Sequence, residues 1–367
     1  MGQSQRSANT PPRPTRRQVY RRRRIAAVFG LGGLVACVGA VAFAVGRDDG
    51  ARPRASAEVS TTSTTSTPEQ TTPATTPSVP AAPRKDAARV RFVAVGDIVM
   101  GSRPYGLPPD GGASFFRSVD TLFAGGDVVM GNLEGTLASG GSSKCGTGSG
   151  PNCFAFRTPP SYAKWLSKAG FTLMNVANNH AFDFGPQGQR ETLTALRRHG
   201  LRHTGRPGQI TIQTVNGVRV AAVGFAAYKW AASLTDIPAA KALVAKAASQ
   251  ADIVVVAMHA GAEGSDATHV RPGNETYLGE PRGNSVAFTH AVIDAGADLV
   301  WSSGPHVLRG MEFHRGRLIA YSLGNFAGYK VFSLGGTLST SAVLQVTLTG
   351  DGAFVSGRIR QIGRAHV

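Results

Sequence analysis

The sequence predicts an α/β domain in which strands and helices alternate along the chain. Five short, nearly continuous apolar runs have the pattern of strands that are covered on both faces: VRFVAVGD, DVVMGNLE, FTLMNVANNH, DIVVVAMHAGAE and ADLVWSSGPH. Stretches of helical composition separate these runs, and each run leads into Asp, Asn, Glu or His. Together these observations favour a layered α/β fold whose strand ends share one crevice.

The segment that precedes the domain has the pattern of a membrane anchor. Ile25 to Val45 is an uncharged apolar run long enough to cross ~30 Å of hydrocarbon as a helix. Arginines flank its N-terminal side, so residues 1–24 are predicted to be a basic cytoplasmic tail and the rest of the chain to be extracellular. The prediction is a single-pass protein of the cell membrane. The alternative is a signal peptide cleaved near Ala44, which would release a secreted protein.

Residues 46–88 are predicted to form a disordered stalk. They are rich in Ser, Thr and Pro and nearly lack large apolar side chains, so they cannot bury enough surface to fold. The folded domain is expected to cover residues 89–361. Residues 362–367, IGRAHV, match a translated sequencing adapter and are expected to be a non-native tail.

The formal net charge of +17 does not by itself indicate a nucleic-acid-binding protein. Part of the excess lies in the N-terminal tail, and the basic residues of the domain are scattered, so no nucleic-acid partner is expected. A moderately basic domain outside the cell would instead favour an anionic polymer or a cell-wall component.

Two cysteines of the predicted extracellular domain flank the Gly-rich segment GTGSGPN. Exported thiols this close in sequence are expected to pair, so Cys145 and Cys153 are predicted to form a disulfide. The alternative is two unpaired cysteines in a loop.

Four helices are predicted between the strands. They cover residues 161–170, 185–200, 240–250 and 285–296, with a proline near the start of the second and Gly200 at its end. Beyond His306 the pattern changes to hairpins around Arg315-Gly316 and Asp351-Gly352, so the sheet is expected to gain antiparallel strands.

Polar side chains at the predicted strand ends define the candidate site. They are Asp97, Asn132, Glu134, Asn179, His180, His259 and His306. Taken singly, each residue is more typical of a turn, a helix cap or a hydrogen-bonded buried histidine. Together they can direct oxygen and nitrogen ligands to one place, which suits one divalent transition metal or a pair of them.

Several motifs resemble those of the CapA family of bacterial capsule or poly-γ-glutamate synthesis proteins. VGDIVMG, DVVMGNLEG, NVANNHAFDFG, DIVVVAMHAGAE and IDAGADLVWSSGPHVLRGMEFHRGRLIAYSLGNF occur in the family's order over about residues 89–348. This family lies within the calcineurin-like metallophosphoesterase superfamily. The resemblance implies a four-layer α/β/β/α sandwich and an anchored, exported protein that acts in capsule or poly-γ-glutamate synthesis, export or anchoring.

The resemblance also implies roles for individual residues. Asp97, Asn179, His259 and His306 correspond to metal ligands, and Asn132 or Glu134 takes the place of the bridging carboxylate. His180 corresponds to the general acid, which Asp183 would orient. Glu263 is expected to assist the metal or substrate, and Asn325 either faces the crevice or is a turn residue. The implied cofactor is one or two divalent ions (Mn, Fe, Zn or Mg), and the implied partners are poly-γ-glutamate and membrane-bound capsule synthase subunits.

Two positions depart from the superfamily pattern. Val99 stands where a histidine usually follows the first aspartate, and Gly304 replaces the first histidine of a His-Pro-His motif. Two usual ligand positions therefore carry no ligand. Three functions stay open: a metal-dependent hydrolase or transferase in capsule synthesis, a non-catalytic polymer-binding assembly factor, and a stand-alone cell-wall metallophosphoesterase.

Overall fold

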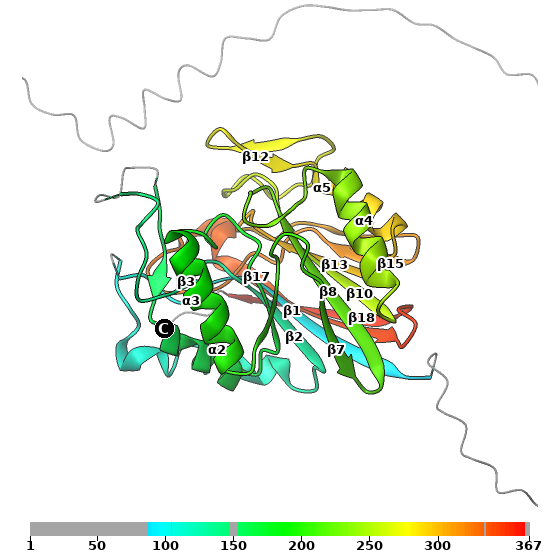
Figure 1. Ribbon diagram of the computed structural model, residues 1–367, viewed down its shortest axis with the longest axis horizontal. Coiled ribbons are helices and arrows are strands. Elements are labelled where there is room, and N and C mark those ends of the chain that lie inside the picture. Colours follow the sequence, from blue (N-terminus) through cyan, green and yellow to red (C-terminus); the bar gives the residue numbers. More distant parts are fainter. Residues whose placement is uncertain (1–86, 104, 147–152, 334, 364–367) are drawn as a thin grey trace, which may run out of the picture. The chain divides into compact units, whose positions relative to one another are not determined.

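The computed structural model describes residues 87–103, 105–146, 153–333 and 335–363 (Figure 1). The predicted cytoplasmic tail, membrane anchor and nearly all of the stalk lie outside the described residues, as does most of the predicted non-native tail. In the part of the chain that is described, no helix has the length and hydropathy needed to cross a membrane.

Two seven-stranded sheets form the centre of the domain, and both mix parallel and antiparallel neighbours. The first has the order β18-β17-β1-β2-β5-β6, with β16 paired to β1, and the second has the order β14-β15-β13-β10-β8-β7, with β9 paired to β8. The first sheet consists of β1 (Arg89–Val99), β2 (Val128–Leu133), β5 (Leu173–Asn175), β6 (Arg202–Thr204), β16 (Asn325–Gly328), β17 (Thr340–Thr349) and β18 (Phe354–Gly363). The second consists of β7 (Thr211–Val215), β8 (Val218–Ala226), β9 (Ala232–Ser233), β10 (Ile253–His259), β13 (Leu299–Ser303), β14 (Met311–His314) and β15 (Arg317–Ala320).

Four α-helices and several short elements complete the described part of the domain. The helices are α2 (Ala163–Ala169), α3 (Gly185–Arg198), α4 (Ile237–Ala248) and α5 (Ser285–Asp294), close to the four predicted ranges. Two small sheets each have two strands: β3 (Thr136–Leu137) pairs in parallel with β4 (Arg157–Thr158), and β11 (Glu275–Tyr277) forms an antiparallel hairpin with β12 (Glu280–Gly283). Short 3₁₀ helices are η1 (Pro109–Gly112), η2 (Asp120–Phe123), η3 (Pro160–Tyr162) and η4 (Gly336–Ser339).

Side-chain caps explain where the helices of the second sheet begin. Asp236 accepts a hydrogen bond from the backbone N of Ala239 (3.0 Å) at the start of α4. Asn284 accepts one from the backbone N of Ala287 (3.0 Å) at the start of α5. Each cap satisfies a backbone donor that has no partner within its helix.

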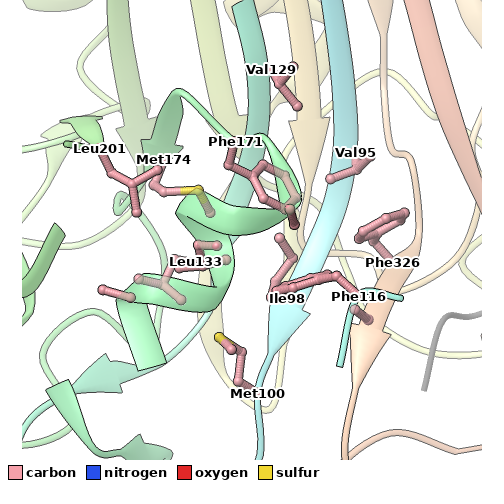
Figure 2. Packing of buried hydrophobic residues seen from close by; sticks show 14 of the residues in the cluster. Val95, Ile98, Met100, Phe116, Val129, Leu133, Phe171, Met174, Leu201 and Phe326 are labelled. Atoms are coloured by element: carbon pink, nitrogen blue, oxygen red, sulfur yellow. The ribbon is translucent and has the colours of Figure 1, made fainter. Parts of the chain in front are cut away.

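Alternating side chains divide the domain into helix, sheet, sheet and helix layers. In β1, Phe92 packs between the two sheets together with Trp301 of β13, whereas Val93 faces the opposite side. On that side it joins the cluster that includes Leu166 of α2 and Leu196 of α3, part of which Figure 2 shows. A third cluster packs α4 and α5 on the outer face of the second sheet.

The structure confirms the two predicted hairpins but corrects the ends of two predicted strands. Strand β5 ends at Asn175, before Asn179 and His180, because the Asn175 amide bonds both the N (3.2 Å) and the O (3.1 Å) of Ala177 and turns the chain. Strand β13 ends at Ser303, and His306 lies in the loop beyond with a left-handed φ of 61°. The site residues therefore follow these strands rather than terminate them.

Candidate metal centre

The first sheet contributes three buried polar residues from two parallel neighbours. Asp97 of β1 and Asn132 of β2 are register partners, and Asn132 Nδ2 donates to Asp97 Oδ1 (2.7 Å). Glu134 follows β2 directly, and its backbone N donates to the carbonyl of Ile98 (3.0 Å). Asp97, Asn132 and Glu134 are fully buried (0% exposed). Parallel pairing thus brings their side chains together at the carboxyl edge of the sheet.

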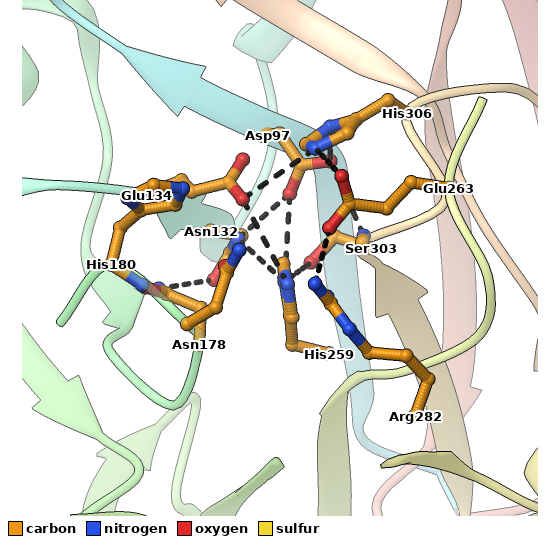
Figure 3. A network of polar contacts seen from close by, with 12 residues as sticks. Asp97, Asn132, Glu134, Asn178, His180, His259, Glu263, Arg282, Ser303 and His306 are labelled. Carbon is orange, nitrogen blue, oxygen red and sulfur yellow. Dashed lines mark hydrogen bonds and ion pairs between the residues drawn. The ribbon is translucent and has the colours of Figure 1, made fainter. Parts of the chain in front are cut away.

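The second sheet brings two histidines to the same place (Figure 3). His306 Nδ1 lies 3.1 Å from Asp97 Oδ2 and 2.9 Å from Asn325 Oδ1. Because both neighbours are oxygen acceptors, Nδ1 carries the proton, and Nε2 is directed toward Glu134 Oε1 (3.8 Å). His259, at the end of β10, has its Nε2 3.8 Å from the same Glu134 oxygen. Glu134 is therefore approached by both histidines.

The donor set and its unmet hydrogen bonds fit a divalent cation. Asp97, Glu134 and His306 each offer a ligand atom, and these atoms lie within 4.8 Å of one another. Both carboxylate oxygens of Glu134, His259 Nε2 and Asn179 Oδ1 are buried and find no hydrogen-bond partner among the described residues. Buried acceptors of this kind are costly unless a cation or a donor satisfies them. Carboxylate, imidazole and amide ligands suit Mn, Fe, Zn or Mg.

The electrostatics of the cluster show an excess of negative charge. Burial and the charge of Asp97 raise the pKa of Glu134 well above its ordinary value. Burial opposes a charged imidazole at His306, yet the charge of Glu134 and the hydrogen bond to Asp97 raise its pKa well above the usual range. Burial lowers the pKa of His259 to about 3. A proton held near Glu134 and His306 thus offsets negative charge that a bound cation would otherwise balance.

His180 and Asp183 form the contact that the motif predicts. His180 Nδ1 lies 2.8 Å from Asp183 Oδ2, and that oxygen also accepts from the backbone N of Phe156 (2.7 Å). The other carboxylate oxygen lies 2.7 Å from Lys144 Nζ, a partner that the sequence did not suggest. Burial lowers the pKa of His180 in spite of the nearby Asp183. The carboxylate therefore fixes the orientation of an imidazole that is neutral in the resting site.

The predicted disulfide is present, since Cys145 and Cys153 are bonded. Cys145 follows Lys144 directly, and the backbone N of Lys144 donates to the carbonyl of Asp183 (2.8 Å). The disulfide-bearing segment is therefore tied to the His180–Asp183 pair through Lys144.

The two adjacent asparagines behave differently. Asn178 is fully buried, donates to Asn132 Oδ1 (3.1 Å) and to the carbonyl of Leu133 (2.9 Å), and accepts from the backbone N of His180 (3.0 Å). Asn178 therefore holds the surrounding backbone and Asn132 in place, a role that was not predicted from the sequence. Asn179 has its Oδ1 buried without a hydrogen-bond partner, so this oxygen remains available as a ligand. The metal role predicted for Asn179 remains a prediction.

Glu263 and Asn325 both lie against His306. Glu263 Oε2 is 3.5 Å from His306 Nε2, and Asn325 bonds Nδ1 of the same ring. Burial opposes ionisation of Glu263, but the hydrogen bond and charge of His306 and the charge of Arg282 lower its pKa to about 2. Arg282, on β12, was not identified from the sequence, because the hairpin that carries it is a polar stretch without a local motif.

At the two positions where the superfamily usually has a histidine, the structure leaves no place for a metal ligand. Val99 is an apolar side chain buried in the strand (2% exposed). A Cβ at Gly304 would lie 3.2 Å from His259 Nε2 and 3.1 Å from the backbone N of Ala260, and the φ of +113° also disfavours a side chain. The loop at residue 304 therefore requires glycine, and the remaining ligand set favours one ion over two.

Comparison with known proteins identifies the family. The model of the bacterial capsule synthesis protein PGA_cap matches residues 91–330. The chain belongs to this family. The PGA biosynthesis protein CapA of Bacillus subtilis is 32% identical over 277 residues, covering 70% of this chain and 67% of that protein. The capsule biosynthesis protein CapA of Bacillus anthracis is 29% identical over 300 residues, covering 76% and 68%. The predicted resemblance to CapA proteins is thus confirmed.

Solved structures show more distant similarity. A putative 5'-nucleotidase from Staphylococcus aureus aligns with a TM-score of 0.43 at 13% identity, covering 75% of this chain and 54% of that chain. The NAD nucleotidase of Haemophilus influenzae aligns with a TM-score of 0.42 at 13% identity, covering 76% and 56%. The chain spans little more than half the length of these two structures.

Proposed function

We propose that this PGA_cap family member is a membrane-anchored, extracellular protein that acts on an anionic polymer such as poly-γ-glutamate through a divalent metal site. The carrying observation is the cluster of Asp97, Glu134 and His306, in which both Glu134 oxygens lack hydrogen-bond partners and Oε1 lies 3.8 Å from His259 Nε2. The names of the Bacillus relatives, which refer to PGA and capsule biosynthesis, support the polymer class.

The reaction that fits the residues is hydrolysis or transfer at an amide or ester bond. Asp97, Glu134, His259 and His306, with Asn179, would hold the cation, which when bound polarises the scissile group. The oxygen of Asn132, which was predicted as a ligand, already accepts from Asn175 (2.9 Å) and Asn178 (3.1 Å), so Asn132 positions Asp97 instead. His180 keeps Nδ1 on Asp183, so its Nε2 is free to accept a proton from the attacking group and return it to the leaving group. Burial of the cluster keeps bulk solvent away from these residues and so strengthens their electrostatic interactions.

The location outside the cell is part of the proposal. It is supported by the apolar run Ile25–Val45, by the arginines that precede it, and by the Cys145–Cys153 disulfide, which is typical of oxidising compartments. Protease treatment of intact cells should remove the domain while residues before the apolar run stay protected. Protection of the domain in intact cells would contradict this orientation.

A second candidate function is a polymer-binding assembly factor without catalysis. The observation that favours it is the loss of two usual ligand positions at Val99 and Gly304. In that case the crevice would bind the polymer, binding would weaken with salt, and no product would form.

One experiment separates these functions. The full chain is purified in detergent, its bound metal is measured by mass spectrometry, and poly-γ-glutamate and a general phosphodiester are assayed for cleavage. We expect about one divalent ion per chain and polymer cleavage that His180→Ala abolishes while metal content is unchanged. The exposed His269→Ala serves as the matched control and should retain activity.

Each result has a defined meaning. A metal-free protein, or cleavage that is unchanged in His180→Ala, would refute the proposed chemistry. Metal and polymer binding without any product would instead establish the assembly factor. Preference for the phosphodiester over the polymer would identify a phosphoesterase.

A further inference from the structure

Arg282 is a buried arginine whose side chain points into the candidate metal centre. It lies on β12, is 3% exposed, and is flanked by the rings of Tyr228 and Tyr277 at 5.9 and 5.5 Å. Its Nη2 is 2.7 Å from Glu263 Oε1, although this contact is not aligned as a hydrogen bond, and 3.4 Å from Glu280 Oε2. One nitrogen therefore faces both acidic neighbours.

The other two guanidinium nitrogens are not used by the described protein. Nε and Nη1 are buried and have no hydrogen-bond partner among the described residues. Buried charged donors are normally satisfied, because leaving them unpaired is costly. Nε and Nη1 lie on different edges of the guanidinium, so each can donate one charge-assisted hydrogen bond to an oxygen of an anionic ligand.

Arg309 shows what a purely structural arginine looks like in the same region. Its Nε donates to the carbonyl of Ala267 (2.7 Å), and Nη1 and Nη2 donate to the two carboxylate oxygens of Glu275 (2.8 Å each). Nη2 also donates to the carbonyl of Ala262 (3.1 Å). Arg282 is equally buried and just as close to acidic groups, but it has donors left over, so it is arranged for a ligand.

The unmet groups of the site divide into two kinds. Glu134 and Asn179 present unpaired oxygens that call for a cation, whereas Arg282 presents donors that call for an anion. Figure 3 shows Arg282 entering the network from the side opposite His180, next to Glu263 and His259. Glu263 connects Arg282 to His306, so an anionic group on Arg282 would lie one side chain away from the proposed metal ligands.

The acidic neighbours select the type of anion. Glu263 and Glu280 already place negative charge beside the guanidinium. A phosphate dianion would be repelled by them more strongly than a carboxylate, which carries one charge. We propose that Arg282 binds a free carboxylate of the substrate chain, which in a γ-linked glutamate polymer is the α-carboxylate of one unit, and so fixes the register of the polymer beside the metal centre. This inference rests on the proposed function, which supplies the polymer.

The test uses a fluorescent γ-linked glutamate octamer and the same octamer with every α-carboxylate converted to an amide. Binding of both to the detergent-solubilised full chain with Mn²⁺ is followed by fluorescence anisotropy. We expect the wild type to prefer the carboxylate octamer at least 10-fold. Arg282→Gln should weaken binding of that octamer by about 10- to 100-fold and leave binding of the amide octamer within twofold, as expected for loss of charge-assisted hydrogen bonds to a carboxylate.

Matched variants separate a specific contact from general charge and from folding. Arg271→Gln removes an exposed charge from the segment between β10 and β11 and should change both affinities less than twofold. Arg282→Lys keeps the charge but removes the Nε and Nη1 donors at their fixed positions, so it should lose most of the preference, and it carries the test if Arg282→Gln does not fold. Glu263→Gln should bind the carboxylate octamer more tightly than the wild type, because it removes an anion that competes for Arg282.

The results that would overturn the inference differ from those that would overturn the proposed function. If Arg282→Gln loses affinity for both octamers equally, or if Glu263→Gln binds the carboxylate octamer more weakly than the wild type, Arg282 only positions Glu263. Displacement of the octamer by inorganic phosphate at lower concentration than by acetate would assign a phosphate site instead. A separate Mn²⁺ titration decides the metal: normal Mn²⁺ binding without carboxylate preference refutes this inference alone, and absence of Mn²⁺ binding in the wild type refutes the proposed function.

Discussion

Gly96→Ala should disrupt the domain and its site together, because Gly96 in β1 touches the backbone of the loop that leads into β16. A Cβ at this position would lie 1.8 Å from the carbonyl O of Gly324 and 3.0 Å from the carbonyl C of Leu323. Ordinary van der Waals contact begins at 3.4 Å, so the two backbones would have to separate by about 1.6 Å.

The Leu323–Gly324 segment cannot move by that amount without losing hydrogen bonds. Gly324 O accepts from Asp97 N (3.0 Å), and Leu323 donates to Ser302 O (3.1 Å) and accepts from Ala342 N (3.1 Å). Overpacking costs about 1–3 kcal/mol and each lost hydrogen bond about 1 kcal/mol. We therefore expect a loss of ~3 kcal/mol in the free energy of unfolding, which lowers the Tm by ~6–12 °C for a domain of this size.

Thermal unfolding and a Mn²⁺ titration measure both consequences. Metal affinity should fall as well, because the displaced backbone carries Asp97 on one side and Asn325 on the other. Gly310→Ala is the matched control, since Gly310 is exposed, has no atom within 4 Å of an added Cβ and has no left-handed φ. It should change the stability by less than about 0.5 kcal/mol. A Gly96→Ala protein as stable as this control would refute the packing argument.

Two further predictions concern buried carboxylates. Glu134→Gln should raise the stability of the metal-free protein by about 1–2 kcal/mol, because it replaces a carboxyl group, whose pKa is raised by burial and by Asp97, with an amide that needs no proton on folding. It should also abolish the stabilisation by Mn²⁺, which for the wild type is ~2.7 kcal/mol of unfolding free energy at a Mn²⁺ concentration 100 times the Kd. A Tm that still rises with Mn²⁺ in this variant would contradict the proposed site. Burial raises the pKa of Asp298 to about 6 from 3.8, so its stabilising contribution is complete below pH 3.8 and is lost as pH rises through about 6. Asp298→Asn, which can still accept from Val254 N, should therefore gain up to about 3 kcal/mol relative to wild type between these pH values in denaturant titrations, and parallel pH profiles of the two proteins would disprove this.

The sequence predicts the layers well because hydrophobic burial leaves a clear pattern. The apolar runs that became β1, β2, β10 and β13 are covered on both faces, and such runs are readable without tertiary information. Strand β8 was not predicted, although its sequence VRVAAVGFA is an apolar run similar to those of β1 and β10. Its small residues have a tertiary cause, because a Cβ at Gly224 would lie 2.3 Å from Asn175 Oδ1.

Part of the site could be predicted from the sequence, because some of its residues lie in these apolar strands. Asp97 is fixed by the register of β1 with β2, and His259 by the register of β10 with β13, so each position follows from its apolar strand. Their convergence depends on how the two sheets pack, which the pattern of a single strand does not reveal. The strand end at Asn175 depends on a side chain that bonds its own backbone, which hydrophobic periodicity does not reveal. Lys144 and Arg282 arrive from a loop and a hairpin, where no local pattern records which buried group they will meet.

The candidate ligands come from both sheets, and this has a consequence for how the domain opens. Asp97 and Glu134 belong to the first sheet, His259 and His306 to the second, and Asp97 and His306 are 209 residues apart in the sequence. An ion held by all four would cross-link the two halves and close a very long loop. Removing it with a chelator should then speed amide hydrogen exchange in β1 and β10 to a similar extent, so the metal would couple the local opening of one sheet to that of the other.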